Sequence, residues 1–138
     1  MIARVLLDTG PLVALLAGDD SRHEECVEQL HSLSPPLLTA LPVLVEADWL
    51  LRDHPQAIEQ AMIWVNAGKI ELLPVEEEAL PWIMTFLRRY QKLKPQITDA
   101  SLVYLAERHD IDTVFTLDRR DFSIFRFGRN RRFRILPG

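Results

Sequence analysis

The sequence predicts an α/β fold with a mostly parallel central sheet that is flanked by helices. Short apolar runs alternate along the chain with longer segments of helical periodicity. Strands that alternate with helices are typical of a sheet covered on both faces. The 138 residues, of which 48% are hydrophobic and 26% charged, suit one globular domain spanning 1–138.

The first half of the chain is expected to hold two strands and four helices. Residues 3–7 form an apolar run that ends at an aspartate, and the helix that follows has proline in its first turn. Residues 41–52 are apolar almost all round a helix, so we expect that helix to be buried. The expected order is strand 3–7, helices 11–17 and 21–33, strand 37–39, and helices 41–52 and 55–66.

The second half continues the alternation. Proline ends a strand at 69–73, and an amphipathic helix at 77–90 and a strongly periodic helix at 98–109 follow. A strand is expected at 113–116, and the bland alternative for residues 118–121 is an ordinary solvated turn. Residues 132–135 alternate between arginine and apolar side chains, which indicates a half-buried final strand.

Charge is unevenly distributed along the chain, although its net value is only −4. Residues 1–118 carry −10, whereas residues 119–138 carry seven arginines and one aspartate. This asymmetry indicates either an anionic partner near the C-terminus or an edge strand protected by charge. The arginines are Arg119, Arg120, Arg126, Arg129, Arg131, Arg132 and Arg134.

The single cysteine, Cys26, cannot form an internal disulfide and fits a reducing cytosol. No apolar run approaches the about 20 residues that a membrane span needs, and the N-terminus lacks the layout of a signal peptide. We therefore expect a cytoplasmic protein that does not enter a membrane.

Two aspartates are expected at the carboxyl ends of strands, where sites form in open α/β sheets. Asp8 follows the first predicted strand and Asp118 follows the strand at 113–116. If these strands are neighbours, the two carboxylates meet at one edge of the sheet. Alternatively, Asp8 caps the next helix and Asp118 belongs to an ordinary turn.

Two further acidic residues lie on predicted helices. Glu46 has apolar helical neighbours, and burying its carboxylate is costly unless a cation or hydrogen-bond donors compensate. Alternatively, it lies at the rim with its carboxylate in water. Asp48 points elsewhere and can pair with Arg52 on the surface. Asp99 opens the helix at 98–109. Alternatively, Thr98 caps this helix and the negative charge of Asp99 stabilises its positive first turn, without any role in a site.

The four acidic residues together favour a metal site. Carboxylates held within a few ångströms repel one another, and a divalent cation removes this conflict. Oxygen ligands favour Mg²⁺, with Mn²⁺ as the other candidate, over zinc. Such a centre lowers the pKa of bound water and orients a phosphodiester. No His/Cys set with metal-binding spacing and no glycine-rich phosphate loop competes with this interpretation.

At these residues the chain resembles the PIN domains. The segments that carry the resemblance are LLDTGPLVAL at 6–15, PVLVE at 42–46, TDASLV at 98–103 and TLDRRDF at 116–122. The resemblance implies a PIN-like three-layer fold and a metal-dependent ribonuclease whose catalytic and metal-binding acids are Asp8, Glu46, Asp99 and Asp118. It also implies the VapC-type toxins, which cut RNA and are neutralised by a small antitoxin, and a homodimer. The chain departs from the pattern at Lys92, where similar proteins often carry another acidic residue.

Three other functions are weaker alternatives. An aspartyl-phosphate phosphatase usually has a second acid two positions after its nucleophile, where this chain has Gly10. A phosphorelay receiver would need a lysine after a late strand. A PIN-like RNA-binding or assembly module without activity is the non-enzymatic alternative.

Because an acidic site repels RNA, basic residues must attract it. We expect some C-terminal arginines, Arg129 and Arg131 among them, to lie beside the site.

Overall fold

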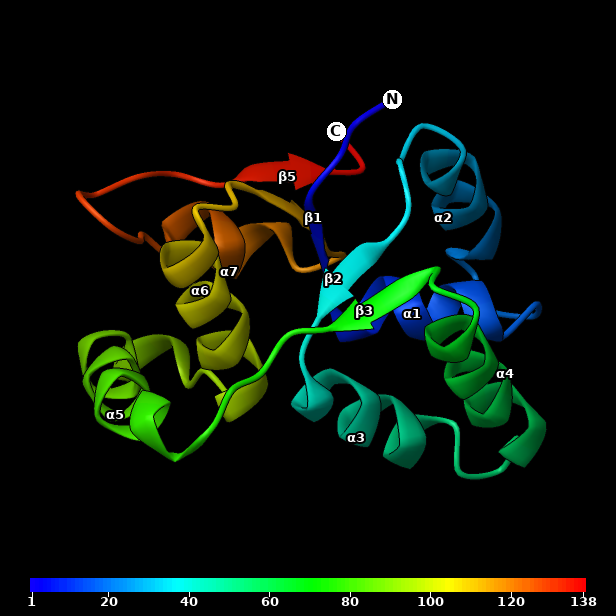
Figure 1. Cartoon of the computed structure of the whole chain (residues 1–138), viewed down its shortest axis with the longest axis horizontal. Coiled ribbons are helices and arrows are strands. Elements are labelled where there is room, and N and C mark those ends of the chain that lie inside the picture. The colour runs from blue at the N-terminus through cyan, green and yellow to red at the C-terminus, as the bar shows by residue number, and fades with distance from the viewer.

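The computed structural model describes residues 1–138 and has a five-stranded, wholly parallel sheet at its centre (Figure 1). The order across the sheet is β3-β2-β1-β4-β5, so the first strand lies in the middle, between β2 and β4. The carboxyl ends of β1 and β4 are therefore neighbours, and the strand order reverses there. The strands are β1 Val5–Leu7, β2 Leu37–Thr39, β3 Ile70–Leu72, β4 Thr113–Phe115 and β5 Arg134–Leu136.

Helices cover both faces of this sheet and confirm the predicted α/β class. In Figure 1, α5, α6 and α7 lie to one side of the strands, and α1, α2 and α4 lie to the other. The helices are α1 Thr9–Leu16, α2 His23–Leu30, α3 Leu41–Leu50, α4 Pro55–Asn66, α5 Leu80–Arg89, α6 Ile97–His109 and α7 Arg119–Ile124. Short 3₁₀ turns at Glu77–Ala79 and Gln91–Leu93 flank α5. None of the helices is both long and apolar enough to span a membrane.

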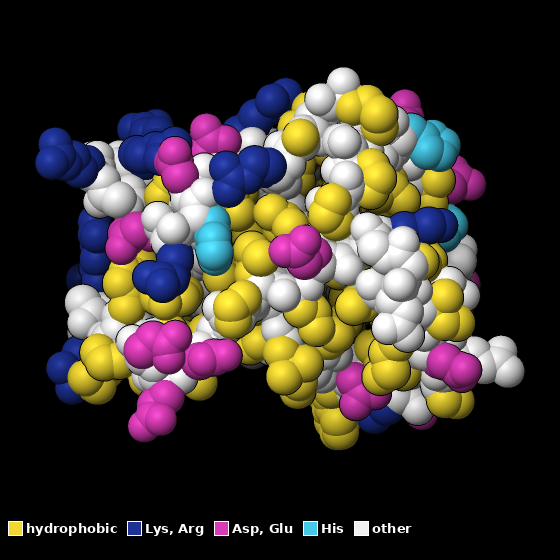
Figure 2. All heavy atoms as spheres, viewed as in Figure 1, with side chains coloured by type: hydrophobic (Ala, Val, Ile, Leu, Met, Phe, Trp, Pro, Cys, Tyr) yellow, Lys and Arg dark blue, Asp and Glu magenta, His cyan; other side chains and the backbone are white.

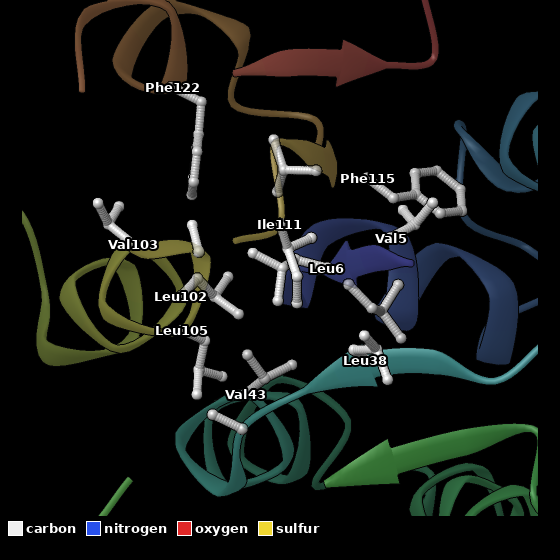
Figure 3. Packing of buried hydrophobic residues seen from close by; sticks show 14 of the residues in the cluster. Val5, Leu6, Leu38, Val43, Leu102, Val103, Leu105, Ile111, Phe115 and Phe122 are labelled. Carbon is white, nitrogen blue, oxygen red and sulfur yellow. The ribbon is translucent and has the colours of Figure 1, made fainter. Parts of the chain in front are cut away.

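The core lies between the strands and the helices, with α6 as its most buried helix. Its residues 100–106 are all buried. Figure 3 shows side chains of β1, β2, α3 and α6 meeting there, among them Leu6, Leu38, Val43 and Leu102. Because α6 is packed on several sides, its N-terminus is a fixed platform beside the carboxyl edge of the sheet.

Three details of the predicted elements are wrong. The turn considered for 118–121 is instead the start of α7, since Phe122 and Phe125 are fully buried and anchor a helix there. The final strand begins at Arg134, two residues later than predicted. The expected helix 77–90 is divided, because α5 begins only at Leu80, after a 3₁₀ turn.

Helix α3 was expected to be buried, but much of it is exposed. Only Val43 and Ala47 are buried, whereas Leu41, Val45 and Trp49 are 59%, 61% and 65% exposed. These three residues are spaced four apart and form one outward stripe, which we call the α3 stripe. Figure 2 shows hydrophobic side chains along the lower edge of the molecule, where Figure 1 places α3.

Candidate active site

An acidic cleft of about 530 Å³ lies at the carboxyl edge of the sheet. All four acidic residues predicted from the sequence line it, together with a fifth carboxylate that was not predicted. Only one hydrophobic side chain takes part. The lining residues are Asp8, Thr9, Gly10, Glu46, Lys94, Gln96, Asp99, Leu117, Asp118 and Asp121.

Asp8 is the most deeply placed acid, only 8% exposed, directly after β1. One carboxylate oxygen accepts a hydrogen bond from the Thr9 N–H at 2.8 Å, and the other accepts one from the Thr116 hydroxyl at 2.7 Å. Burial raises the pKa of Asp8 to about 7, although both hydrogen bonds lower it; repulsion by Asp99 and Glu46 adds to the rise. Asp8 is thus both the cap of α1 and a site carboxylate.

Thr116 joins the two aspartates that follow β1 and β4. Its buried hydroxyl donates to Asp8 and accepts from the N–H of Asp118 at 3.0 Å. Asp118 in turn caps α7, accepting from the N–H of Asp121 at 3.2 Å. The parallel pairing of β1 with β4, which the sequence alone left as a condition, is what brings these residues together.

Asp99 lies on the first turn of α6, held by a capping box rather than by the expected cap. The residue before the helix is Gln96, whose N–H donates to the Asp99 carboxylate at 2.9 Å. Thr98 lies inside the helix and is buried, so its expected role as cap is wrong. The pKa of Asp99 is raised to about 6, first by burial and then by Asp118, Glu46 and Asp121, while the bond from Gln96 lowers it.

Glu46 reaches the cleft from α3 and is half-buried, with no hydrogen bond to the protein. Asp48 is exposed and does not line the cleft, in agreement with the expectation that only one of the two faces the site. The expected pairing of Asp48 with Arg52 is not formed. Instead, the Arg52 guanidinium lies 4.1 Å from the centre of the Trp49 ring and donates to the Trp49 carbonyl at 2.8 Å.

Sequence reasoning missed two charged residues of the cleft. Asp121 is one helical turn after Asp118, so predicting α7 would have placed it correctly. Its pKa is raised by burial and by Asp118. Lys94 reaches the cleft because the backbone turns sharply between α5 and α6, and no sequence pattern indicates such a turn there.

Of the C-terminal arginines, Arg120 lies beside the site, 4.0 Å from the Asp121 carboxylate, but Arg129 and Arg131 do not. The side chain of Arg131 pairs with Asp110 and Asp112, which precede β4. The site follows β4 at its other end, and the strand between spans about 10 Å at 3.3 Å per residue. The loop that contains Arg129 and Arg131 therefore lies at the amino edge of the sheet, away from the acidic cleft.

The residues of the cleft fit a hard divalent cation. Every acidic side chain offers oxygen, and a divalent cation would stabilise the charged forms of Asp8 and Asp99, which burial and neighbouring carboxylates disfavour. The buried hydroxyl of Thr9, beside Asp8 in the same cleft, has no hydrogen-bond partner. No three of the acidic side chains are grouped closely enough to form a metal site by themselves.

Comparisons with known proteins agree with this fold. The model of the PIN domain family matches residues 5–128. Ribonuclease VapC26 of Mycobacterium tuberculosis is 27% identical over 135 residues, which are 96% of this chain and 100% of that protein. The crystal structure of the Sarcin-Ricin loop cleaving toxin VapC20 of Mycobacterium tuberculosis matches with a TM-score of 0.72 and 20% identity, over 80% of this chain and 86% of that one. Since the family match runs through all five carboxylates of the cleft, the chain belongs to the PIN domain family.

Proposed function

We propose that this PIN domain is a Mg²⁺-dependent endoribonuclease that hydrolyses phosphodiester bonds in RNA, with Mn²⁺ as the alternative ion. The observation that carries the proposal is the cleft itself: five carboxylates at the point where strand order reverses, three of them with raised pKa values. The relatives support it, because VapC26 is a ribonuclease and VapC20 cleaves the Sarcin-Ricin loop.

The acidic residues have separate roles in this proposal. Asp8, Asp99 and Asp118 hold the ion, directly or through water, and Glu46 completes the acidic set. A bound divalent cation lowers the pKa of water and offsets charge on the phosphate. Glu46 makes no hydrogen bond to the protein, so its carboxylate is free to orient the attacking water and to accept its proton.

Second-layer hydrogen bonds fix the orientation of two of these acids. The Thr116 hydroxyl and the Thr9 N–H hold Asp8, and the Gln96 N–H holds one oxygen of Asp99. Each aspartate oxygen has two lone pairs, so these bonds leave acceptor capacity for a cation. The ligands are then preorganised by β1, β4 and α6 rather than by mobile loops.

We further propose that the chain is the toxin of a toxin–antitoxin pair and acts in the cytoplasm. VapC20 is described as a toxin, and a ribonuclease that harms its own cell needs a neutralising partner, here a small antitoxin protein.

The α3 stripe supports the expected homodimer. A second copy would remove Leu41, Val45 and Trp49 from water, and exposed apolar patches of this kind mark interfaces.

A nuclease assay tests the proposed activity. The purified chain is incubated with a labelled single-stranded RNA and with an RNA hairpin, in EDTA, Mg²⁺ or Mn²⁺. We expect internal cleavage only with metal, loss of cleavage in Asp99→Asn, and normal cleavage in Asp48→Asn, which removes an exposed carboxylate outside the cleft. RNA that is bound but never cut would instead favour a PIN-like binding module.

A further inference from the structure

Lys94 is the only basic side chain that lines the acidic cleft. Its ammonium group forms no ion pair and no hydrogen bond with any of the five carboxylates. Lys94 is exposed, so a cation at the rim of a negative cleft that is not bound to the acids is available for another anion. Because metal binding offsets the charge of the acids, that anion meets less repulsion in the loaded site.

The backbone holds Lys94 at this place. The residue ends the 3₁₀ turn Gln91–Leu93 in the left-handed conformation, with φ 52° and ψ 51°, and its N–H donates to the Gln91 carbonyl at 3.1 Å. A residue with a side chain adopts this conformation at a cost, and such residues concentrate at functional sites. Pro95 follows, and then the capping box of Gln96 and Asp99. One short segment therefore positions both a site carboxylate and the lysine.

The other basic residues near the site are already engaged. Arg119 donates to the Pro137 carbonyl, and the side chain of Arg120 lies 4.0 Å from the Asp121 carboxylate. Arg131 pairs with aspartates at the opposite edge of the sheet. Among these residues, only Lys94 lines the cleft, and it has neither an ion pair nor a side-chain hydrogen bond.

We infer that Lys94 binds a backbone phosphate of the RNA strand next to the one that is cleaved. This inference rests on the proposed function and names a substrate-binding residue for it. The cation in the cleft would offset charge at the cleaved phosphate, whereas the neighbouring phosphates still face the remaining carboxylates. A lysine at the rim attracts one of them and sets the register of the strand over the acids. Lysine serves as a point charge here, with no preference for base sequence.

Lys94→Gln, compared with Lys92→Gln, tests the inference. Both changes remove one exposed lysine charge from the same short segment, but Lys92 does not line the cleft. Binding of a fluorescent single-stranded RNA is measured across a salt series with Mg²⁺ present. Both variants are made in an Asp118→Asn background, so that the RNA stays intact. We expect Lys94→Gln to weaken binding several-fold and to reduce the salt slope by about 0.7, and Lys92→Gln to leave the slope unchanged.

Kinetics of the cleaving protein supply a second readout. With Asp118 intact, Lys94→Gln should raise KM more than it lowers kcat, and Lys94→Arg should restore most of the loss. Equal salt slopes in the two glutamine variants would overturn the inference and leave Lys94 as a counter-charge for the acids. A protein that binds RNA with the Lys94-dependent slope but never cuts it would support the inference and contradict the proposed nuclease function.

Discussion

Replacing Asp8 with asparagine separates the charge of this carboxylate from its shape. In the folded protein burial raises the pKa of Asp8 from 3.8 to about 7. Between about pH 4 and pH 7 the folded state therefore holds a proton that the unfolded chain releases, and the free energy of unfolding falls as pH rises through this window. At 1.36 kcal/mol per pH unit, the difference between the two pKa values corresponds to about 4 kcal/mol.

The asparagine side chain of this variant carries no charge at any pH, yet its carbonyl can still accept from the Thr9 N–H. We expect Asp8→Asn to match the wild type in stability near pH 4 and to exceed it by up to about 4 kcal/mol at pH 8 without metal. Metal-dependent cleavage should be lost. Urea denaturation in EDTA at the two pH values measures the stabilities, and Asp48→Asn, exposed and without a hydrogen-bond partner, should show no such pH-dependent gain.

The opposite result would refute this reasoning. A variant that is less stable than the wild type at pH 8, by the about 1 kcal/mol typical of a lost helix cap or more, would mean that the hydrogen bonds of Asp8 outweigh the cost of its buried charge. Asp8 would then be a structural cap first. Its contribution to a metal site would have to be judged from metal binding alone.

Four other predictions concern the metal, the second layer of the site and the surface. Mg²⁺ at about 100 times its dissociation constant should stabilise the wild type by about 2.7 kcal/mol and raise its melting temperature. Glu46→Gln should reduce this rise and Asp48→Asn should leave it unchanged. Equal rises in the two variants would indicate nonspecific binding. Thr116→Val should lower Mn²⁺ affinity in a titration and cost about 1–3 kcal/mol of stability, and unchanged affinity would contradict its role between the two aspartates. Val45→Asp should convert a dimer to a monomer in sedimentation velocity; a dimer that persists would place the interface elsewhere. Arg131→Glu should lower the free energy of unfolding by about 1 kcal/mol, because it breaks exposed ion pairs, and should leave the rate of RNA cleavage unchanged. A slower rate would indicate that this loop contributes to the site.

The alternation of strands and helices and the four candidate acids could be predicted from the sequence because they depend on short-range patterns, whereas the order of the strands across the sheet could not. An apolar run ending at an aspartate indicates a strand with a carboxylate at its carboxyl end, and parallel neighbours bring such ends together. Asp8 and Asp118 follow this rule. Glu46 and Asp48 point about 200° apart on a helix, so only one of them can face the site, and the apolar neighbours of Glu46 favour Glu46. The structure places Glu46 in the cleft and Asp48 outside it.

Tertiary packing decided what the sequence pattern could not. Helix α7 forms because Phe125 packs against Phe86 and Tyr90, with ring centres 4.9 Å and 5.1 Å apart, and no local signal indicates these partners. In α3, apolar residues surround the helix, so the pattern gives no direction. Val43 is buried and Val45 exposed only because neighbouring elements cover one side of α3.

The position of the arginine-rich segment is set by the sheet topology and not by its closeness to Asp118 in the sequence. Its position directly after Asp118 in the sequence favoured a place beside the acids. However, β5 pairs parallel with β4, and Arg134 lies opposite Thr113. Residues that precede β5 must then lie beside residues that precede β4, at the amino edge of the sheet, where Asp110 and Asp112 meet Arg131. The proposed attraction of RNA to the acidic cleft would therefore depend on cations at the carboxyl edge, and Lys94 is the basic side chain that lines the cleft there.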